Sequence, residues 1–334
     1  MKEKIQIGNR LIGKGEPTFV IAEIGSNHDN KFSQAIEMID IAVESGVDAV
    51  KFQLYYAASL WPKNSRSYQI LKPLETDRHW IDKLIEYCGR RKIIFLATPF
   101  DKEAIDLLDK ANVPALKWPS SEIYDLPLLK YAAQKKKSMI MATGACRMLD
   151  VEKAVNAVKT AGNTEIILLH CVSAYPTKPK DANLRIMDAL REKFSVPVGF
   201  SDHTEGISVA LAAVARGANV IEKHFTISRK LTGPDHGFAL EPNELREMTQ
   251  GIREVEQSLG SYEKSIIADA EDPNFIVRLF SGCRVAKGTL LTKDMITVKR
   301  ANFGIFPESF DDVLERKVTM DIEEDVPLTW EMFN

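Results

Sequence analysis

The 334 residues of the chain (37.5 kDa) exceed one average domain, so we expect one large domain and one small one. Hydrophobic residues make up 45% and charged residues 27%, which is ordinary for a soluble globular protein and excludes a disordered chain, a collagen-like repeat and a disulfide scaffold. Lysine and arginine total 44 and aspartate and glutamate total 47, and this net charge of −3 gives no general electrostatic footprint for nucleic acid.

The chain begins with MKEKIQIGNR, which is too polar for a signal peptide, and no run approaches the roughly 18 apolar residues of a membrane span. The cysteines are scattered, with no C-x-x-C and no zinc-type spacing. We therefore expect reduced thiols in a cytoplasmic protein without membrane contact. The first segment, IQIGNRLIGKGEP at residues 5–17, predicts a small hairpin in position to plug the bottom of the fold that follows.

Eight short apolar, β-branched runs then alternate with stretches of helical periodicity. The runs begin near Phe19, Asp48, Ile93, Ala115, Ser138, Ile166, Val196 and Asn219. Their mean spacing of about 29 residues is close to the roughly 31 residues per unit of an eight-fold βα barrel. Intervening segments such as Ile36, Ile39 and Val43 have helical spacing. The pattern predicts an α/β protein with a (β/α)8 TIM barrel.

A doubly wound open sheet also alternates strands and helices, and it is the alternative to the barrel. Its dinucleotide-binding fingerprint is missing, because GKGEPT at residues 13–18 fails at the last position and opens no helix. No Walker A sequence is present either. The absence of both motifs favours the barrel.

The longest connection follows the second predicted strand, and residues 55–75 within it look like a loop containing Pro62 and Pro73. On a barrel this loop leaves the carboxyl rim, where active sites are built, so it is a candidate lid. A plain surface insertion is the equal alternative.

The pattern changes near the C-terminus. Charged residues and Pro273 indicate a linker, and short strand-like pieces with a G-T-L-L-T turn follow. We place the barrel domain at residues 1–265, the linker at 266–280 and a small β-rich domain at 281–334. A domain of this size has a marginal core, so we expect it to dock on something.

Polar side chains gather at the carboxyl ends of all eight predicted strands, where barrel enzymes build their sites. Residues two apart share one face of a strand, as Lys51 and Gln53 do, and also Glu222 and His224. The other members are Glu23, Thr98, Lys117, Ser120, Thr143, Ser201 and His203. Such a concentration of polar groups is difficult to explain by packing and predicts an active site at this rim.

Two of these residues, His203 and His224, end adjacent strands with the same parity. Adjacent strands lie about 4.8 Å apart, so both imidazoles can reach one ion. Two protein nitrogens with several waters suit Mn²⁺ or Mg²⁺ better than a closed zinc site. A lone strand-end histidine is more often a structural group, and we interpret His79 and His170 in that way.

Lys51 and Lys117 are costly to bury at strand ends unless they meet an anion. They predict a cradle for phosphate and carboxylate groups. The cradle would be completed by the hydroxyls of Thr98, Ser120 and Thr143 and by the backbone of Gly144. The alternative is that the lysines pair with Glu23 or Glu222.

Eight motifs along these strands resemble those of the sialic acid (nonulosonate) synthases. They are IAEIGSNH (21–28), VKFQ (50–53), ATPF (97–100), KWPS (117–120), ATG (142–144), HCVSAYP (170–176), GFSDH (199–203) and EKHFT (222–226). VKRANFGI at 298–305 resembles the C-terminal antifreeze-like (SAF) domain of the same family. The resemblance implies a transferase that condenses phosphoenolpyruvate with an N-acyl mannosamine or related amino sugar and releases phosphate. It also implies a domain-swapped homodimer in which the SAF domain caps the partner's active site.

The resemblance carries roles over residue by residue. His203 and His224 match the metal ligands, for which Mn²⁺ is the expected ion and Mg²⁺ or Co²⁺ the alternatives. The phosphoenolpyruvate contacts match Lys51, Thr98, Lys117, Ser120 and Ser201. Positions around the acceptor sugar match Glu23, Gln53, Tyr175 and Asp235, with Phe100 and Phe275 as aromatic lining. Arg300 corresponds to the arginine that the SAF domain presents to a neighbouring subunit's sugar, and Glu23 or Glu222 would position the water.

Three departures leave the acceptor open. Ala142 replaces a serine common in relatives, Ser173 stands where synthases of N-acetylneuraminate often have asparagine, and residues 301–303 replace P-G-N. The acceptor is N-acetylmannosamine, its phosphate or a 2,4-diacetamido sugar. Rival functions are a related barrel that makes a 3-deoxy-ulosonate phosphate and a non-catalytic sugar- or ice-binding relative. The SAF-like segment disfavours the first, and the intact lysines and histidines disfavour the second.

Overall fold

A computed structural model describes residues 2–264 and 276–334, and the chain divides into two compact units, Met1–Gly260 and Ser261–Asn334. The first unit is a closed barrel of eight parallel strands in the order β10-β3-β4-β5-β6-β7-β8-β9. The strands are β3 (Phe19–Gly25), β4 (Ala49–Leu54), β5 (Ile94–Pro99), β6 (Ala115–Trp118), β7 (Ser138–Ala142), β8 (Ile166–Cys171), β9 (Val198–Asp202) and β10 (Val220–His224). The predicted barrel is confirmed, and the largest error in a strand start is at β9, expected from Val196.

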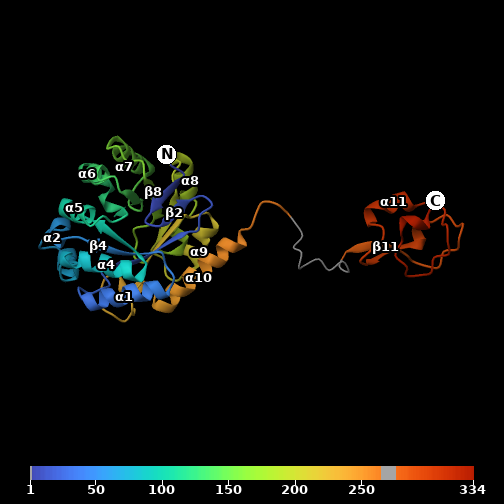
Figure 1. The fold of residues 1–334 in the computed structure, drawn as a ribbon, viewed down its shortest axis with the longest axis horizontal. Coiled ribbons are helices and arrows are strands. Elements are labelled where there is room, and N and C mark those ends of the chain that lie inside the picture. The colour runs from blue at the N-terminus through green and yellow to red at the C-terminus, as the bar shows by residue number, and fades with distance from the viewer. Residues whose placement is uncertain (1, 265–275) are drawn as a thin grey trace. The chain divides into compact units, whose positions relative to one another are not determined.

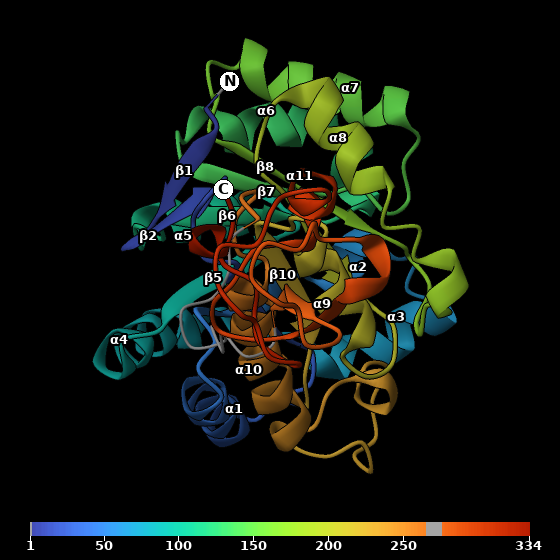
Figure 2. The ribbon, with the colours of Figure 1, turned by 90° about the vertical axis from the view of Figure 1, so that its right-hand side faces the viewer.

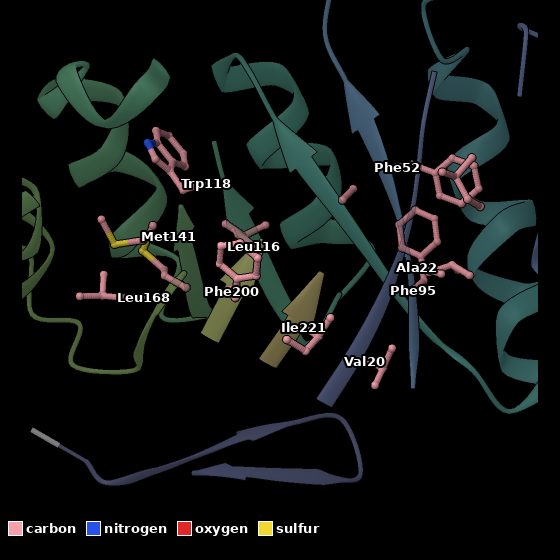
Figure 3. Close-up of a cluster of buried hydrophobic side chains, with 14 of the residues drawn as sticks. Val20, Ala22, Phe52, Phe95, Leu116, Trp118, Met141, Leu168, Phe200 and Ile221 are labelled. Carbon is pink, nitrogen blue, oxygen red and sulfur yellow. The ribbon is translucent and has the colours of Figure 1, made fainter. Parts of the chain in front are cut away.

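Helices surround the barrel (Figure 1). They are α1 (Phe32–Glu44), α4 (Ile81–Arg91), α5 (Lys102–Lys110), α6 (Leu126–Gln134), α7 (Met148–Thr160), α8 (Ile186–Phe194), α9 (Ser208–Ala215) and α10 (Pro242–Ser258). Side chains that point outward from the strands, such as Val20, Phe52 and Phe200, pack with the buried faces of the helices in one large cluster (Figure 3). Burial of this apolar surface holds the helices on the barrel.

The N-terminal hairpin, β1 (Lys4–Ile7) paired with β2 (Arg10–Gly13), closes one end of the barrel (Figure 2). Its residues Ile5, Ile7 and Ile12 are fully buried in a second cluster, together with inward-facing residues near the amino ends of the strands, such as Phe19 and Ala115. The expectation that this segment plugs the bottom is therefore confirmed.

The segment after β4 differs from the predicted loop. It contains α2 (Ala57–Leu60), α3 (Arg66–Leu71) and a 3-10 turn at Lys72–Leu74. The Ser65 hydroxyl caps α3 by accepting a hydrogen bond from the Tyr68 N–H at 3.1 Å, and both prolines lie outside this helix. Its role as a lid stays a prediction. Further 3-10 turns in this unit are Arg78–Trp80, Ser121–Tyr124, Pro179–Asp181 and His236–Phe238.

The second unit has its own core. The strands β11 (Val277–Ser281) and β12 (Ile296–Arg300) pair antiparallel, and α11 (Phe310–Val313) and three 3-10 turns (Lys293–Met295, Pro307–Ser309 and Trp330–Met332) accompany them. The core residues are Leu279, Val285, Leu291, Ile305, Val313, Val318, Ile322, Leu328 and Phe333. The strand β11 begins at Val277, inside the segment 266–280 that we predicted as linker, and its residue Leu279 belongs to this core. Across both described ranges, no helix is long and apolar enough to span a membrane.

Substitution of Ile7 by alanine should weaken the barrel, because it opens a cavity beneath the plug. We expect the free energy of unfolding to fall by about 2–5 kcal/mol in urea titrations of the purified protein. Leu11→Ala, in the same hairpin but 37% exposed, is the matched control and should change it far less. Equal losses in both variants would show that the hairpin does not plug the barrel.

Candidate active site

A buried polar network lies at the carboxyl ends of β3, β4 and β5. The Lys51 ammonium is 2.6 Å from a carboxylate oxygen of Glu23 and donates a hydrogen bond to the Thr98 hydroxyl at 3.2 Å. The Gln53 amide donates to the other oxygen of Glu23 at 2.7 Å. The Glu23 and Lys51 side chains are almost fully buried, with relative exposures of 1% and 2%. Four residues predicted from strand-end parity are thus brought together.

Glu222 on β10 joins this network to β6 and β9. Its carboxylate lies 3.1 Å from the Lys117 ammonium and 3.8 Å from that of Lys51, and it accepts a hydrogen bond from the Ser201 hydroxyl at 2.9 Å. Both lysines therefore pair with carboxylates, which is the alternative that the sequence left open. The two buried cations are compensated inside the protein before any substrate anion arrives.

The two glutamates differ in their pKa values. Burial alone would raise the pKa of Glu222, but the charges of Lys117 and Lys51 outweigh it and lower the pKa to about 2. For Glu23, burial raises the pKa and the neighbouring charge of Glu222 adds to the effect, while Lys51 opposes it. Glu222 is therefore the firmly ionised member, and Glu23 is the member that more readily holds a proton.

A second cluster lies beside Lys117, at the ends of β6, β7 and β8. The Ser120 hydroxyl accepts a hydrogen bond from the Gly144 N–H at 2.8 Å and contacts the Cys171 thiol at 3.1 Å. A Cβ at Gly144 would lie 2.6 Å from the Cys171 sulfur and 2.8 Å from the Ser173 hydroxyl, so the close approach of these loops requires glycine. Ser120 and Gly144, two members of the predicted cradle, are thus neighbours, and Ser173 lies beside them.

Thr143, which was expected in the cradle, and its neighbour Ala142 both contact the barrel itself. The Thr143 hydroxyl donates to the Leu169 carbonyl at 3.0 Å, so it is engaged by the backbone of the barrel. Ala142 packs in the apolar cluster inside the barrel, beside Leu169 and Cys171, which accounts for an alanine there.

The two histidines face each other beside the lysine network, with ring centroids 5.6 Å apart. His203 follows β9, and its Nδ1 lies 2.8 Å from the Val172 carbonyl oxygen, which leaves Nε2 as the nitrogen with a lone pair. The Nδ1 of His224 is buried without a hydrogen-bond partner, 3.8 Å from the carboxylate of Asp235. This orphaned atom marks a place where a ligand would satisfy the protein.

Aromatic rings enclose the histidine pair. The Tyr175 ring lies 4.3 Å from that of His203, and Phe238 lies 5.2 Å from His224, between centroids. Burial lowers the pKa of His203, and it lowers that of His224 to about 4. Neutral imidazoles are the form that binds a metal ion. Among the described residues, no group of three or more histidine, cysteine or acidic side chains is arranged to hold a metal ion.

The remaining predicted residues lie in three places. Asp235 accepts a hydrogen bond from the Ser26 hydroxyl at 3.3 Å, within the same rim. Phe100 follows β5 and packs edge-on against Tyr55 at 5.9 Å. Arg300 ends β12 in the second unit, and Phe275 lies outside the described residues.

Sequence reasoning missed four participants in this region. Cys171 and Phe238 contact the site but carry no catalytic signature that a pattern could detect. The other two are Asp202 and Lys223, a buried ion pair at 2.7 Å. A lysine inside the apolar end of a strand was the available signal for this pair, and it was overlooked because its parity points away from the site.

Comparison with known proteins gives two family matches. Residues 38–264 match the model of the NeuB family, and residues 284–334 match the model of the SAF domain. Together these matches span most of the chain.

Individual relatives agree with these matches. The N,N'-diacetyllegionaminic acid synthase of Legionella pneumophila is 38% identical over 340 residues, which cover 96% of this chain and 95% of the relative. The spore coat polysaccharide biosynthesis protein SpsE of Bacillus subtilis is 37% identical over 358 residues, with 98% and 96% coverage. The solved N-acetylneuraminic acid (sialic acid) synthetase of Leptospira borgpetersenii, in complex with citrate, superposes with a TM-score of 0.77 at 36% identity, over 81% of this chain and 95% of that one.

Lowering the pH should destabilise the metal-free protein through its buried neutral histidines. His28 shows the effect most clearly, because its Nδ1 accepts from the Asn30 N–H at 3.0 Å, its Nε2 lies 2.8 Å from the Thr76 hydroxyl, and burial lowers its pKa to about 4. In the unfolded chain the ring takes its proton near pH 6.5, so between these values the unfolded state binds more protons and gains stability. From pH 7 to pH 5 this one residue should cost about 2 kcal/mol.

The measurement is the free energy of unfolding in urea at pH 7, 6 and 5. His28→Gln should lose about that much of the pH dependence, and substitution of the exposed His79 is the control. A slope unchanged by His28→Gln would contradict the prediction.

Proposed function

The chain belongs to the NeuB family, and from this premise we propose that it is a metal-dependent synthase that condenses phosphoenolpyruvate with an N-acyl mannosamine-type amino sugar. The product is a sialic acid or a related nonulosonic acid, and phosphate is released. One observation carries the proposal. Two almost fully buried lysines, Lys51 and Lys117, converge at one rim beside a pair of buried neutral histidines.

The lysine pair suits a small substrate with two anionic ends. A carboxylate and a phosphate group on one molecule can replace Glu23 and Glu222 as partners of the two ammonium groups. The hydroxyls of Thr98, Ser120 and Ser201 lie around the two lysines and can supply further hydrogen bonds to the anion. These contacts would hold the enol carbon close to a second substrate, and such positioning is a large part of catalysis in a two-substrate condensation.

The histidine pair fits a divalent ion, for which Mn²⁺ is the expected species and Mg²⁺ and Co²⁺ are alternatives. His203 and His224 would hold it, since burial keeps both neutral and the Nδ1 of His224 has no other partner. When bound, such an ion polarises a carbonyl oxygen as a Lewis acid. The open-chain aldehyde of the sugar is the group that needs this polarisation.

The two glutamates have different roles in the proposed bond-forming and water-addition steps. In the reaction, carbon 3 of phosphoenolpyruvate bonds to the aldehyde carbon, and positive charge develops at carbon 2. The firmly ionised Glu222 stabilises that charge. Water then adds at carbon 2, the carbon–oxygen bond to phosphate breaks, and the carbonyl of the product forms. Glu23, whose pKa burial raises, is placed to exchange the proton that this step requires.

The acceptor sugar would lie on the outer side of this network. Asp235 and Gln53 offer polar contacts, and the exposed ring of Tyr175 offers an apolar one. Ser173 leaves more space than an asparagine would. Since the Legionella relative forms N,N'-diacetyllegionaminic acid, a 2,4-diacetamido sugar stands beside N-acetylmannosamine and its phosphate as an acceptor to test.

A condensing enzyme that makes a 3-deoxy-ulosonate phosphate is the second candidate. The solved 3-deoxy-D-arabino-heptulosonate 7-phosphate synthase of Thermotoga maritima shares the barrel fold with a TM-score of 0.63. At 16% identity, this likeness supports the fold and not the function. The SAF match at residues 284–334 favours the nonulosonate synthase. A non-catalytic sugar-binding relative would have no use for two buried lysines beside the histidine pair.

The first test follows phosphate released from phosphoenolpyruvate with a panel of amino-sugar aldoses and Mn²⁺, with the product identified by mass. Tetrose and pentose phosphates test the second candidate. Chelation by EDTA should remove turnover, and Mn²⁺ should restore it. His203→Ala should abolish turnover with the fold intact, whereas His79→Ala should leave turnover unchanged. Full activity after exhaustive EDTA treatment would refute the metal requirement.

We also propose a cytoplasmic, domain-swapped homodimer in which Arg300 reaches the partner's acceptor sugar. The support is the family membership and the small SAF unit that carries Arg300. A guanidinium there would hydrogen-bond the hydroxyl or acyl oxygens of the sugar and help to exclude water.

Mixing two inactive variants, Arg300→Ala and His203→Ala, tests the shared site. In a swapped dimer, half of the sites in the heterodimer regain both groups, so activity should reappear after subunit exchange. Native mass spectrometry of the mixture verifies the exchange. Activity that stays at the level of each variant alone, despite exchange, would place Arg300 in its own chain's site.

A further inference from the structure

Two charged side chains lie directly behind the histidine pair, on the other face of the same strands. Asp202 precedes His203 and Lys223 precedes His224, and each is only 1% exposed. Phe200 and Ile221, two residues earlier with the same parity, belong to the layer between barrel and helices (Figure 3). Asp202 and Lys223 are therefore an ion pair buried outside the barrel wall, with no access to the substrate.

This ion pair is the last rung of the ladder between β9 and β10. The register pairs Phe200 with Ile221, Ser201 with Glu222 and Asp202 with Lys223, and it ends there. His203 lies beyond β9, so no registered ladder pair to β10 fixes its position relative to His224. The restraint on His203 must come from other contacts.

Lys223 supplies that restraint from both sides of the histidine. Its ammonium donates to the Asp202 carboxylate at 2.7 Å and to the Thr204 carbonyl at 2.7 Å. The other Asp202 oxygen accepts from the Thr204 N–H at 2.8 Å. Residues 202 and 204 are thus tied to one point on β10, and the backbone of His203 is held between them.

We propose that Asp202 and Lys223 are positioning residues, which set the place of the His203 ring relative to His224. The inference deepens the proposed function and rests on it where it concerns metal binding. Two further bonds complete the arrangement, because the Thr177 N–H donates to the His203 carbonyl at 2.8 Å and the Val172 carbonyl accepts from Nδ1. These hold the loop after β8, whereas the Lys223 contacts hold His203 to β10.

A contribution to stability alone does not explain the pair. Burying two charges costs about as much as their attraction returns, so replacing both members by neutral groups of similar size is often nearly neutral for stability. By contrast, loss of groups that orient a metal ligand typically lowers metal affinity by about 10- to 100-fold. The two roles therefore predict different results for a variant without either charge.

The experiment compares the double variant D202N/K223M with D48N/R253M. The first keeps the acceptor for the Thr204 N–H but removes both charges. The second removes a partly buried ion pair at 3.2 Å, which joins the amino end of β4 to α10 at the opposite end of the barrel. Circular dichroism and thermal unfolding establish that each protein is folded. The probes are Mn²⁺ alone, titrated by electron paramagnetic resonance, and the ring resonances of ¹³C-labelled histidine in metal-free protein, with His203 assigned by His203→Ala.

We expect D202N/K223M to weaken Mn²⁺ binding at least about tenfold and to shift or broaden the His203 resonance, whereas D48N/R253M changes neither. If D202N/K223M does not fold, the double variant D202N/K223Q, which also leaves neither charge unpaired, decides by the same two readouts. A folded variant with an unchanged His203 resonance and unchanged Mn²⁺ affinity would overturn the inference. If the wild type binds no Mn²⁺, the proposed metal site fails, and the His203 resonance alone decides whether the pair positions the ring.

Discussion

The burial of two lysines at one rim is the constraint on which the site depends. Removing an ammonium group from water costs on the order of several kcal/mol, so Lys51 and Lys117 require partners. Glu23 and Glu222 supply these partners, and Gln53 and Ser201 hold the carboxylates in turn. Both cations are therefore compensated inside the protein, although one buried carboxylate oxygen of Glu23 and one of Glu222 accept no hydrogen bond.

The barrel builds this cluster from only one or two polar residues at the end of each strand. Parallel strands bring their carboxyl ends to one rim, and alternation sends every second side chain inward, so one polar pair per strand is enough. The same alternation places Asp202 and Lys223 outward, where they form a buried ion pair next to the two histidines in sequence. Residues that face the candidate site and residues that face the helices thus alternate along β9 and β10.

Sequence reasoning reached the barrel and most of the rim because both follow from periodicity. These predictions depend only on local features of the sequence, and the folded structure keeps those features. They are the eight runs, the plugging hairpin and the shared parity of His203 and His224. Periodicity carries no information about which partner a side chain selects across the barrel. It therefore left open whether Lys117 meets Glu222, and it missed the contact of Cys171 with Ser120. The loop prediction at residues 55–75 failed because Pro62 and Pro73 both lie outside α3 and leave room for a short helix that the Ser65 hydroxyl caps.

The unequal pKa values of the two glutamates link the free site to the reaction. The lysines lower the pKa of Glu222 to about 2, whereas burial raises the pKa of Glu23, so Glu23 is the carboxylate whose negative charge is held less firmly. An anionic substrate is attracted to such a site, and it raises the proton affinity of Glu23 further when it binds. In the proposed reaction, the ionised Glu222 would lie close to the carbon on which positive charge develops. The carboxylate that makes the two buried lysines tolerable in the free protein is thus the same group that would favour the charged transition state of the proposed reaction.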